Sequence, residues 1–121
     1  MARKIDRIEK IVSQNVTITD AENTTPADGI DLYGYSLLGI SFPTTFDGTT
    51  IGFTVSTSLG GTYNQMLDKN GVAYSKTCAA SKYLPLDPTD FAGIQFIKPV
   101  AGTNQDTTDT ILTFHLAPIL N

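Results

Sequence analysis

The residues of this chain that could carry chemistry are few and lie far apart in the sequence. His115 is its single histidine and Cys78 its single cysteine, so a nucleophilic pair requires a fold that brings the two together. Asp87 and Asp90 have the spacing of a carboxylate pair such as glycosidases use. They flank Pro88, however, and this stretch predicts one helical turn with Asp87 as its N-cap. We therefore predict a protein that is not an enzyme.

The chain also lacks the patterns that bind metals or cofactors. Cys78 has no cysteine or histidine partner at metal-ligand spacing, so we expect a small buried apolar residue. The loop from Asp20 to Gly29 holds several carboxylates, but their spacing matches no calcium-loop pattern and favours a solvated loop. The glycine-rich stretch 58–62 lacks the lysine of a phosphate-binding loop. The sequence thus predicts no metal and no cofactor.

Aromatic residues are the remaining candidates for ligand binding. The sequence has no tryptophan, which weakens a carbohydrate-binding interpretation because sugar rings often stack on aromatic faces. His115 lies in a predicted strand, on the face opposite Phe114, where a single histidine is more often a surface or interface residue than a base. Packing in the core or on a sheet is the more common role of the five tyrosines. These are Tyr33, Tyr35, Tyr63, Tyr74 and Tyr83.

Charge is unevenly distributed along the chain. The whole sequence has a formal net charge of −4, but four basic and two acidic residues give the first ten positions +2, which leaves −6 for the rest. The basic residues of this segment are Arg3, Lys4, Arg7 and Lys10. An acidic body repels nucleic acid, so we expect no nucleic-acid partner. No apolar run approaches the roughly 20 residues of a membrane span, and no secretory signal is visible, so we expect no membrane partner and synthesis in a cytoplasm.

Residues 3–12 have the pattern of a short amphipathic helix. Ile5, Ile8, Ile11 and Val12 recur at spacings of three and four residues and would share one face. An isolated helix of this length is marginal in water, so it must pack on another surface. Its own domain and another subunit or larger assembly are equally compatible with the pattern.

The rest of the chain alternates apolar and polar residues with the period of β-strands. The stretches 38–42, 51–55 and 112–116 show this most clearly, because successive side chains of a strand point to opposite faces. We expect Pro43 and Pro99 to end strands, a hairpin turn at Asn70-Gly71 and a mobile polar loop at 101–109. The predicted strands span 16–19, 30–42, 51–57, 63–67, 72–77, 82–86, 94–98 and 109–117.

These patterns together predict an all-β fold in one domain. With 121 residues the chain fits a single domain, and roughly eight short strands suit a jelly-roll-like two-sheet β-sandwich. We divide the chain into a short N-terminal helical arm at 1–13 and a β-sandwich domain at 14–121.

The order of several short blocks resembles a family of small β-sandwich proteins that tailed bacteriophages encode beside the major capsid protein. The resemblance covers roughly residues 30–97, and the arm is not part of it. The blocks are Leu38-Gly39-Ile40-Ser41-Phe42-Pro43, Phe53-Thr54-Val55-Ser56, Gly60-Gly61-Thr62-Tyr63, Asp68-Lys69-Asn70-Gly71, Tyr83-Leu84-Pro85-Leu86-Asp87-Pro88 and Phe91-Ala92-Gly93-Ile94.

The resemblance implies a non-enzymatic virion protein, synthesised in the host cytoplasm, on the outside of the phage capsid. It would be a decoration or cement protein, or the base of a head fibre, with the major capsid protein as partner and a homotrimer as the favoured assembly. A glycan- or receptor-binding module of a phage fibre is the alternative, and a hydrolase that depends on His115 is a weaker third.

For the capsid-binding function we expect the arm to make the contact. Its basic residues would meet an acidic capsid surface while its apolar residues are buried, although arm packing within a homo-oligomer, with the loops touching the capsid, fits the pattern too. The predicted partner-binding residues are Arg3, Lys4, Ile5, Arg7, Ile8, Lys10 and Val12.

Overall fold

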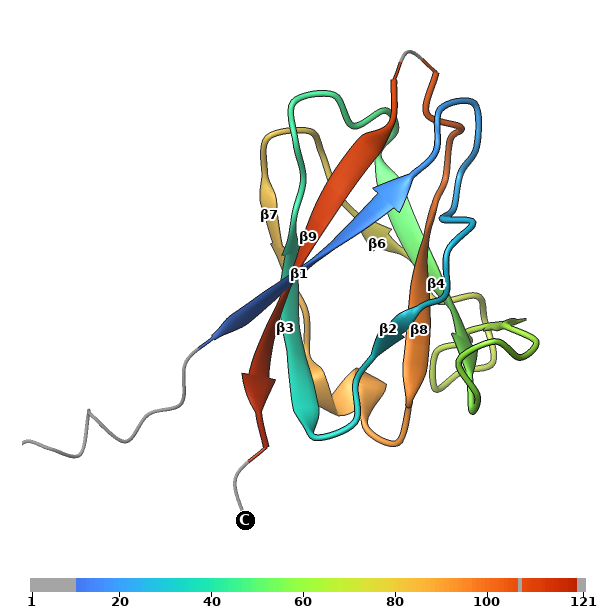
Figure 1. The fold of residues 1–121 in the computed structure, drawn as a ribbon, viewed down its shortest axis with the longest axis vertical. Helices are drawn as coiled ribbons and strands as arrows, with labels where there is room; N and C mark the ends of the chain where they lie inside the picture. Colours follow the sequence, from blue (N-terminus) through green and yellow to red (C-terminus); the bar gives the residue numbers. More distant parts are fainter. Residues whose placement is uncertain (1–10, 107, 120–121) are drawn as a thin grey trace, which may run out of the picture.

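Two antiparallel β-sheets face each other in the computed structural model, which describes residues 11–106 and 108–119 (Figure 1). The described residues form nine strands and one short 3-10 helix, η2 (Pro88–Phe91). The strands are β1 (Val12–Ile18), β2 (Ile30–Asp31), β3 (Tyr35–Ser41), β4 (Thr50–Ser56), β5 (Asn64–Gln65), β6 (Lys76–Thr77), β7 (Tyr83–Pro85), β8 (Phe96–Ala101) and β9 (Thr110–Pro118). The prediction of an all-β sandwich is confirmed.

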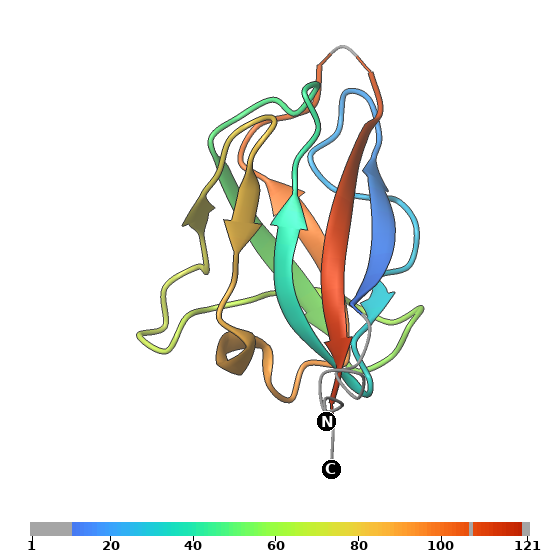
Figure 2. The ribbon, with the colours of Figure 1, turned by 90° about the vertical axis from the view of Figure 1, so that its left-hand side faces the viewer.

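The first sheet has the strand order β1-β9-β3-β7, and these four strands lie side by side in Figure 2. The second sheet has the order β2-β8-β4-β5, with β6 also paired to β4. The chain changes sheet at most of its connections, so strands that are neighbours in a sheet are distant in sequence. Residues from both ends of the chain therefore meet on one face, as β1 and β9 do.

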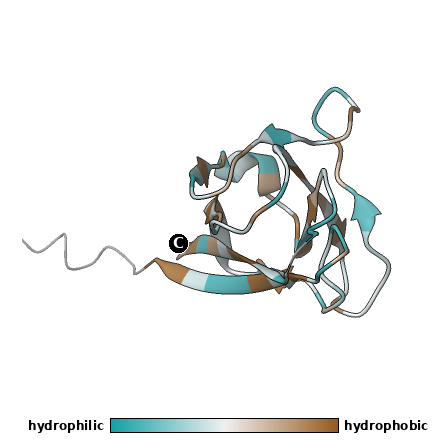
Figure 3. Cartoon of the chain, turned by 90° about the horizontal axis from the view of Figure 1, so that it is seen from above, coloured by the Kyte–Doolittle hydropathy of each residue, from teal (hydrophilic) through white to brown (hydrophobic). Residues whose placement is uncertain are grey.

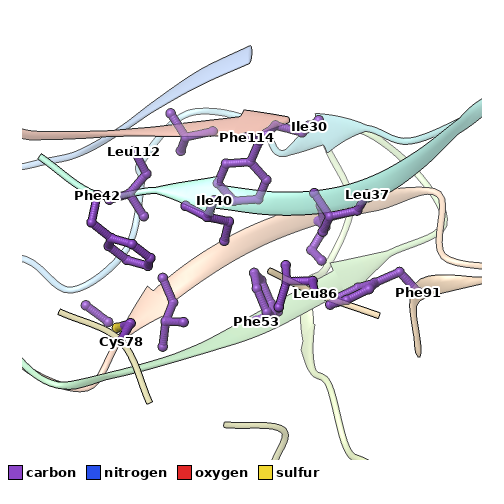
Figure 4. Close-up of a cluster of buried hydrophobic side chains, with 14 of the residues drawn as sticks. Ile30, Leu37, Ile40, Phe42, Phe53, Cys78, Leu86, Phe91, Leu112 and Phe114 are labelled. Carbon is purple, nitrogen blue, oxygen red and sulfur yellow. The ribbon is translucent and has the colours of Figure 1, made fainter. Parts of the chain in front are cut away.

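The core lies between the sheets and follows from the period-two pattern. Residues of β9 alternate between buried and half-buried or exposed, with Leu112, Phe114 and Leu116 directed inward. Phe53 of β4 reaches across the core, with ring centroids 5.4 Å from Phe91 and 6.4 Å from Phe114 in edge-to-face geometry (Figure 4). Brown and teal segments accordingly alternate along the chain in Figure 3.

The predicted strand 30–42 is wrong in its continuity. A turn interrupts it, in which the Tyr35 amide donates to the Leu32 carbonyl and Gly34 has a φ of +80°. The piece before the turn is β2 in the second sheet, and the piece after it is β3 in the first. A bulge between Leu37 and Gly39 then shifts the register. Leu37 and Ile40 are therefore both buried, although a regular strand over 30–42 would direct an odd and an even position to opposite faces.

The prediction that Pro99 ends a strand is also wrong, because β8 continues through it to Ala101. Pro99 lies opposite Phe53 of β4. The Phe53 carbonyl accepts from the Met66 amide, on the side of β4 that faces β5, so the backbone polar groups of Phe53 point away from β8. Pairing of β8 with β4 therefore needs no N–H from Pro99. The Pro99 carbonyl accepts from the Thr24 hydroxyl at 2.8 Å.

The strands predicted at 63–67 and 72–77 are shorter than expected, because only β5 and β6 of them pair with β4, but two predicted turns are confirmed. The Asp87 carboxylate accepts from the Thr89 amide and hydroxyl and so caps η2, and these hydrogen bonds lower the pKa of Asp87. Asn70-Gly71 lies in a tight turn in which the Asp68 amide donates to the Val72 carbonyl.

The predicted helix at 3–12 is wrong at its last residue. Val12 is the first residue of β1 and pairs with Leu116, because the alternating pattern of the strand begins there rather than at the expected domain boundary. The remaining predicted partner-binding residues of the arm lie outside the described residues. These are Arg3, Lys4, Ile5, Arg7, Ile8 and Lys10.

Candidate functional site

The two ends of the sandwich are built differently. We call the end formed by the segments 19–22, 42–49, 102–106 and 108–109 the sealed end; it is at the top of Figure 1. We call the opposite end, formed by the segments 32–35, 92–95 and 119, the open end; it is at the bottom. Their hydrogen bonding and exposure decide which end is available to a partner.

Gln105 is the centre of the sealed end. Its side chain is fully buried, with the Asp47 amide donating to Oε1 at 2.8 Å and the Thr110 hydroxyl at 3.1 Å. Its Nε2 donates in turn to the carbonyls of Asp47, at 2.9 Å, and Thr103, at 3.1 Å. The backbone of Gln105 also pairs with Ala21 and Glu22. The side chain and backbone of Gln105 together join three loops, and all the hydrogen-bonding capacity of the side-chain amide is used within the protein.

Two carboxylates extend this network. The Asp106 amide donates to Oδ2 of Asp47 at 3.0 Å, and the Asp20 amide donates to Oδ1 of Asp109 at 2.9 Å. The prediction of a mobile polar loop at 101–109 is therefore wrong at Gln105, because this residue is buried and hydrogen-bonded. No local sequence pattern distinguishes this buried glutamine, because it lies in a polar stretch among other loop residues.

The open end leaves apolar side chains exposed around a hollow of about 420 Å³. Tyr33 is 79% exposed and Ile119 is 53% exposed. The Ile119 amide donates to the Gly34 carbonyl at 2.8 Å, which holds the end of β9 beside the turn that carries Tyr33. Other side chains that line the hollow are those of Tyr35, Phe91, Ala92, Ile94 and Gln95.

The beginning of β1 adjoins the open end. Val12 pairs with Leu116, and two residues further along β9 Pro118 pairs with Tyr35. Ile11, the first described residue, is 58% exposed. The first described residues, Ile11 and Val12, therefore lie toward the open end of the sandwich.

A polar group of side chains lies on the outer face of the first sheet. The Ser41 hydroxyl and Nε2 of His115 are 2.8 Å apart and form a hydrogen bond, and the Tyr83 ring lies 5.4 Å from the His115 ring. A Cβ at Gly39 would collide with the Tyr83 ring, so the glycine allows the ring to lie over β3. The predicted position of His115 opposite Phe114 is confirmed, since Phe114 is buried and His115 only half-buried.

A nucleophilic triad contains a serine beside a histidine and also a third group that orients the histidine. In the described part of the chain, the side-chain hydrogen bond of His115 is the one to Ser41, and no carboxylate bonds to the ring. The arrangement there is that of a hydrogen-bonding pair on a sheet face.

The other predicted chemical residues are separated from one another. Cys78 is in the core, where burial raises the pKa of its thiol to about 11, whereas His115 is on the outer face, so they form no dyad. Asp90 accepts from the Tyr74 hydroxyl at 3.3 Å. Burial, and secondly the charge of Asp90, raise the pKa of Tyr74 to about 12.

Among residues 11–106 and 108–119, no three histidine, cysteine or acidic side chains gather as metal ligands.

None of the helices in the described ranges has the length and apolarity required to cross a membrane. Comparisons of the chain with protein-family models, with curated proteins and with solved structures found no match.

Proposed function

We propose that this protein is a non-enzymatic virion component that binds the outside of a phage capsid as a decoration or cement protein or as a head-fibre base. It would be made in the host cytoplasm and bind the major capsid protein as a homo-oligomer, with a trimer favoured by the resemblance. The observation that carries the proposal is the open end, where exposed apolar side chains adjoin the point at which the basic N-terminal segment enters the sandwich.

Tyr33, Ile11 and Ile119 are each more than half exposed, and Tyr33 and Ile119 line the same hollow. Exposed apolar patches of this kind are typical of protein-binding sites. The first ten residues add a net charge of +2 to a body of −6. An acidic partner surface would be attracted to this side, with the charges guiding encounter and the apolar groups contributing affinity.

The finer assignment of the fold as a jelly roll belongs to this proposal. Its support is the nested order of pairing: β1 pairs with β9, β2 with β8 and β3 with β7, while β4 pairs with β5 and β6. Nested pairs of this kind result when one long hairpin is wrapped across two sheets, as in the jelly rolls of viral capsid proteins.

Co-sedimentation with capsid shells tests the proposal. The shells are those of the phage that encodes the chain, assembled without it. We expect saturable binding of the full-length protein that weakens as salt is raised, because the arm contact is charged. Absence of binding, together with absence of the protein from purified virions, contradicts the proposal.

The chain offers a matched control for the role of the arm. Half of its eight basic residues are in the arm and half in the sandwich, so two quadruple variants remove the same charge. We expect R3Q/K4Q/R7Q/K10Q to weaken shell binding about tenfold or more, and K69Q/K76Q/K82Q/K98Q to weaken it much less. Equal loss in both would indicate that net charge, and not the arm, determines binding.

One observation favours the alternative of a glycan-binding module. Tyr83 is half-exposed and lies beside His115 and Ser41, so an aromatic ring and hydrogen-bonding groups share one surface. Retention on a glycan array that is lost in Tyr83→Ala and kept in Tyr33→Ala would support this alternative. No retention of the unmodified protein would contradict it.

A further inference from the structure

Among residues 11–106 and 108–119, strand β1 is a sheet edge without the usual protection. It has seven residues and pairs on one side with β9, without a bulge. Its sequence contains no charged residue and no proline, whereas proteins commonly shield their edges with lysine, proline, bulges or short strands. The opposite edge of the sheet, β7, has three residues, contains Pro85 and follows Lys82. Figure 2 shows β1 at one margin of the sheet, with no further strand beyond it.

We propose that β1 pairs antiparallel with β1 of a second copy of this chain, about a twofold axis at Asn15, to join two four-stranded sheets into one. In this register all seven residues of β1 are paired with β1 of the second copy, and Ser13 lies opposite Thr17. Odd-numbered residues pair with odd-numbered ones and even with even, so side chains on the outer face of one sheet lie beside those on the outer face of the other.

The composition of the strand suits pairing with itself. On the outer face, Ser13, Asn15 and Thr17 are exposed, uncharged and able to form hydrogen bonds with one another. No like charges meet in this register, since β1 carries none. Figure 3 shows the hydrophilic colour along the middle of β1, which continues from the grey trace.

Space for the inward side chains of the second strand is present beside β1. A groove of about 420 Å³ lies between β1 and the segment 25–31, lined in part by Gln14, Val16 and Ala27. In the proposed register, Gln14 and Val16 of the second copy face this side of the sheet.

The pairing goes beyond the proposed function and has a consequence for it. Antiparallel strands direct the two open ends in opposite directions. One copy would bind the shell while the other presents its open end outward, where a further component can attach.

Sedimentation equilibrium of the full-length protein, without shells, tests the pairing. We expect an assembly with an even number of chains, a dimer or, where trimers also form, a hexamer. A monomer or trimer across the micromolar range would overturn the inference. Because shells are absent, this result is independent of whether the protein binds a capsid.

Charge variants test the register. S13K/T17K places lysine opposite lysine at two points and should weaken pairing about tenfold or more. S13K/T17E and S13E/T17K place opposite charges there and should restore it. All three change exposed side chains, and equal unfolding midpoints would show that the fold is intact. Unchanged pairing in S13K/T17K, or equal loss in all three variants, would overturn the proposed register.

Discussion

The sealed and open ends of this sandwich differ in how their loops are held and covered. At the sealed end, side chains of Gln105 and Asp47 bond two loops to each other, and the backbone of Gln105 bonds a third. At the open end, Tyr33 and Ile119 stay more than half exposed around a hollow. Polar groups at the sealed end are satisfied internally, while apolar groups at the open end are not covered.

The difference separates stability from binding. Residues of the sealed end are coupled to the fold, so changing them should cost stability and little else. The side chains of Tyr33 and Ile119 at the open end are mostly exposed, so changing them should leave the fold intact and alter what it binds. Variants at the two ends test this separation.

Gln105→Leu should have the largest effect on stability. It leaves the Asp47 amide and the Thr110 hydroxyl without their partner, and unsatisfied buried groups cost about 1–3 kcal/mol each. We expect urea unfolding to show a loss of about 3 kcal/mol. Gln95→Leu, at an exposed position of the open end, is the control and should change stability by less than about 0.5 kcal/mol. Similar losses in both variants would remove the distinction between the ends.

Alkaline pH should loosen the side of the core next to η2. Tyr74 packs 5.5 Å from Phe91, and its pKa in the folded protein is about 12 against an ordinary 10.0. A raised pKa means that the stabilisation is fully present below pH 10 and is lost as pH rises toward 12. We expect Tyr74→Phe to reduce the loss over this window. An unfolding midpoint of Tyr74→Phe that falls as steeply with pH as that of the unmodified protein would contradict this assignment.

Asp109→Ala tests a weaker part of the sealed end. The variant removes the acceptor of the Asp20 amide in an exposed position, where water can replace it. We expect a loss of about 1 kcal/mol in thermal or urea unfolding, clearly below that of Gln105→Leu. A loss of stability as large as that of Gln105→Leu would mean that the carboxylates stabilise the sealed end as much as Gln105 does.

Tyr33→Asp should have the smallest effect on the fold. The Tyr33 side chain is 79% exposed, and surface substitutions of this kind usually change stability by less than about 0.5 kcal/mol. Unfolding of this variant by urea should therefore match that of the unmodified protein. A loss above 1 kcal/mol would show that the open end supports the fold.

Much of the fold could be predicted because period-two patterns act locally. The alternation around Phe114 and Phe53 was enough to find β9 and β4. The division of 30–42 between two sheets could not be predicted, because its apolar pattern continues through the turn at Gly34. Pro99 inside β8 and Gln105 inside the sealed end depend on partners that are distant in sequence. The open end itself has no sequence signature, since Tyr33 and Ile119 resemble core residues until the fold leaves them exposed.

Binding of two variants to capsid shells would show whether the open end is the partner-binding surface. Tyr33→Asp changes the open end, and Asn104→Asp adds the same charge at an exposed position of the sealed end. We expect Tyr33→Asp to weaken co-sedimentation with shells at least about tenfold and Asn104→Asp to bind as the unmodified protein does. Full binding by Tyr33→Asp, or loss of binding only in Asn104→Asp, would contradict the assignment of the open end as the partner-binding surface.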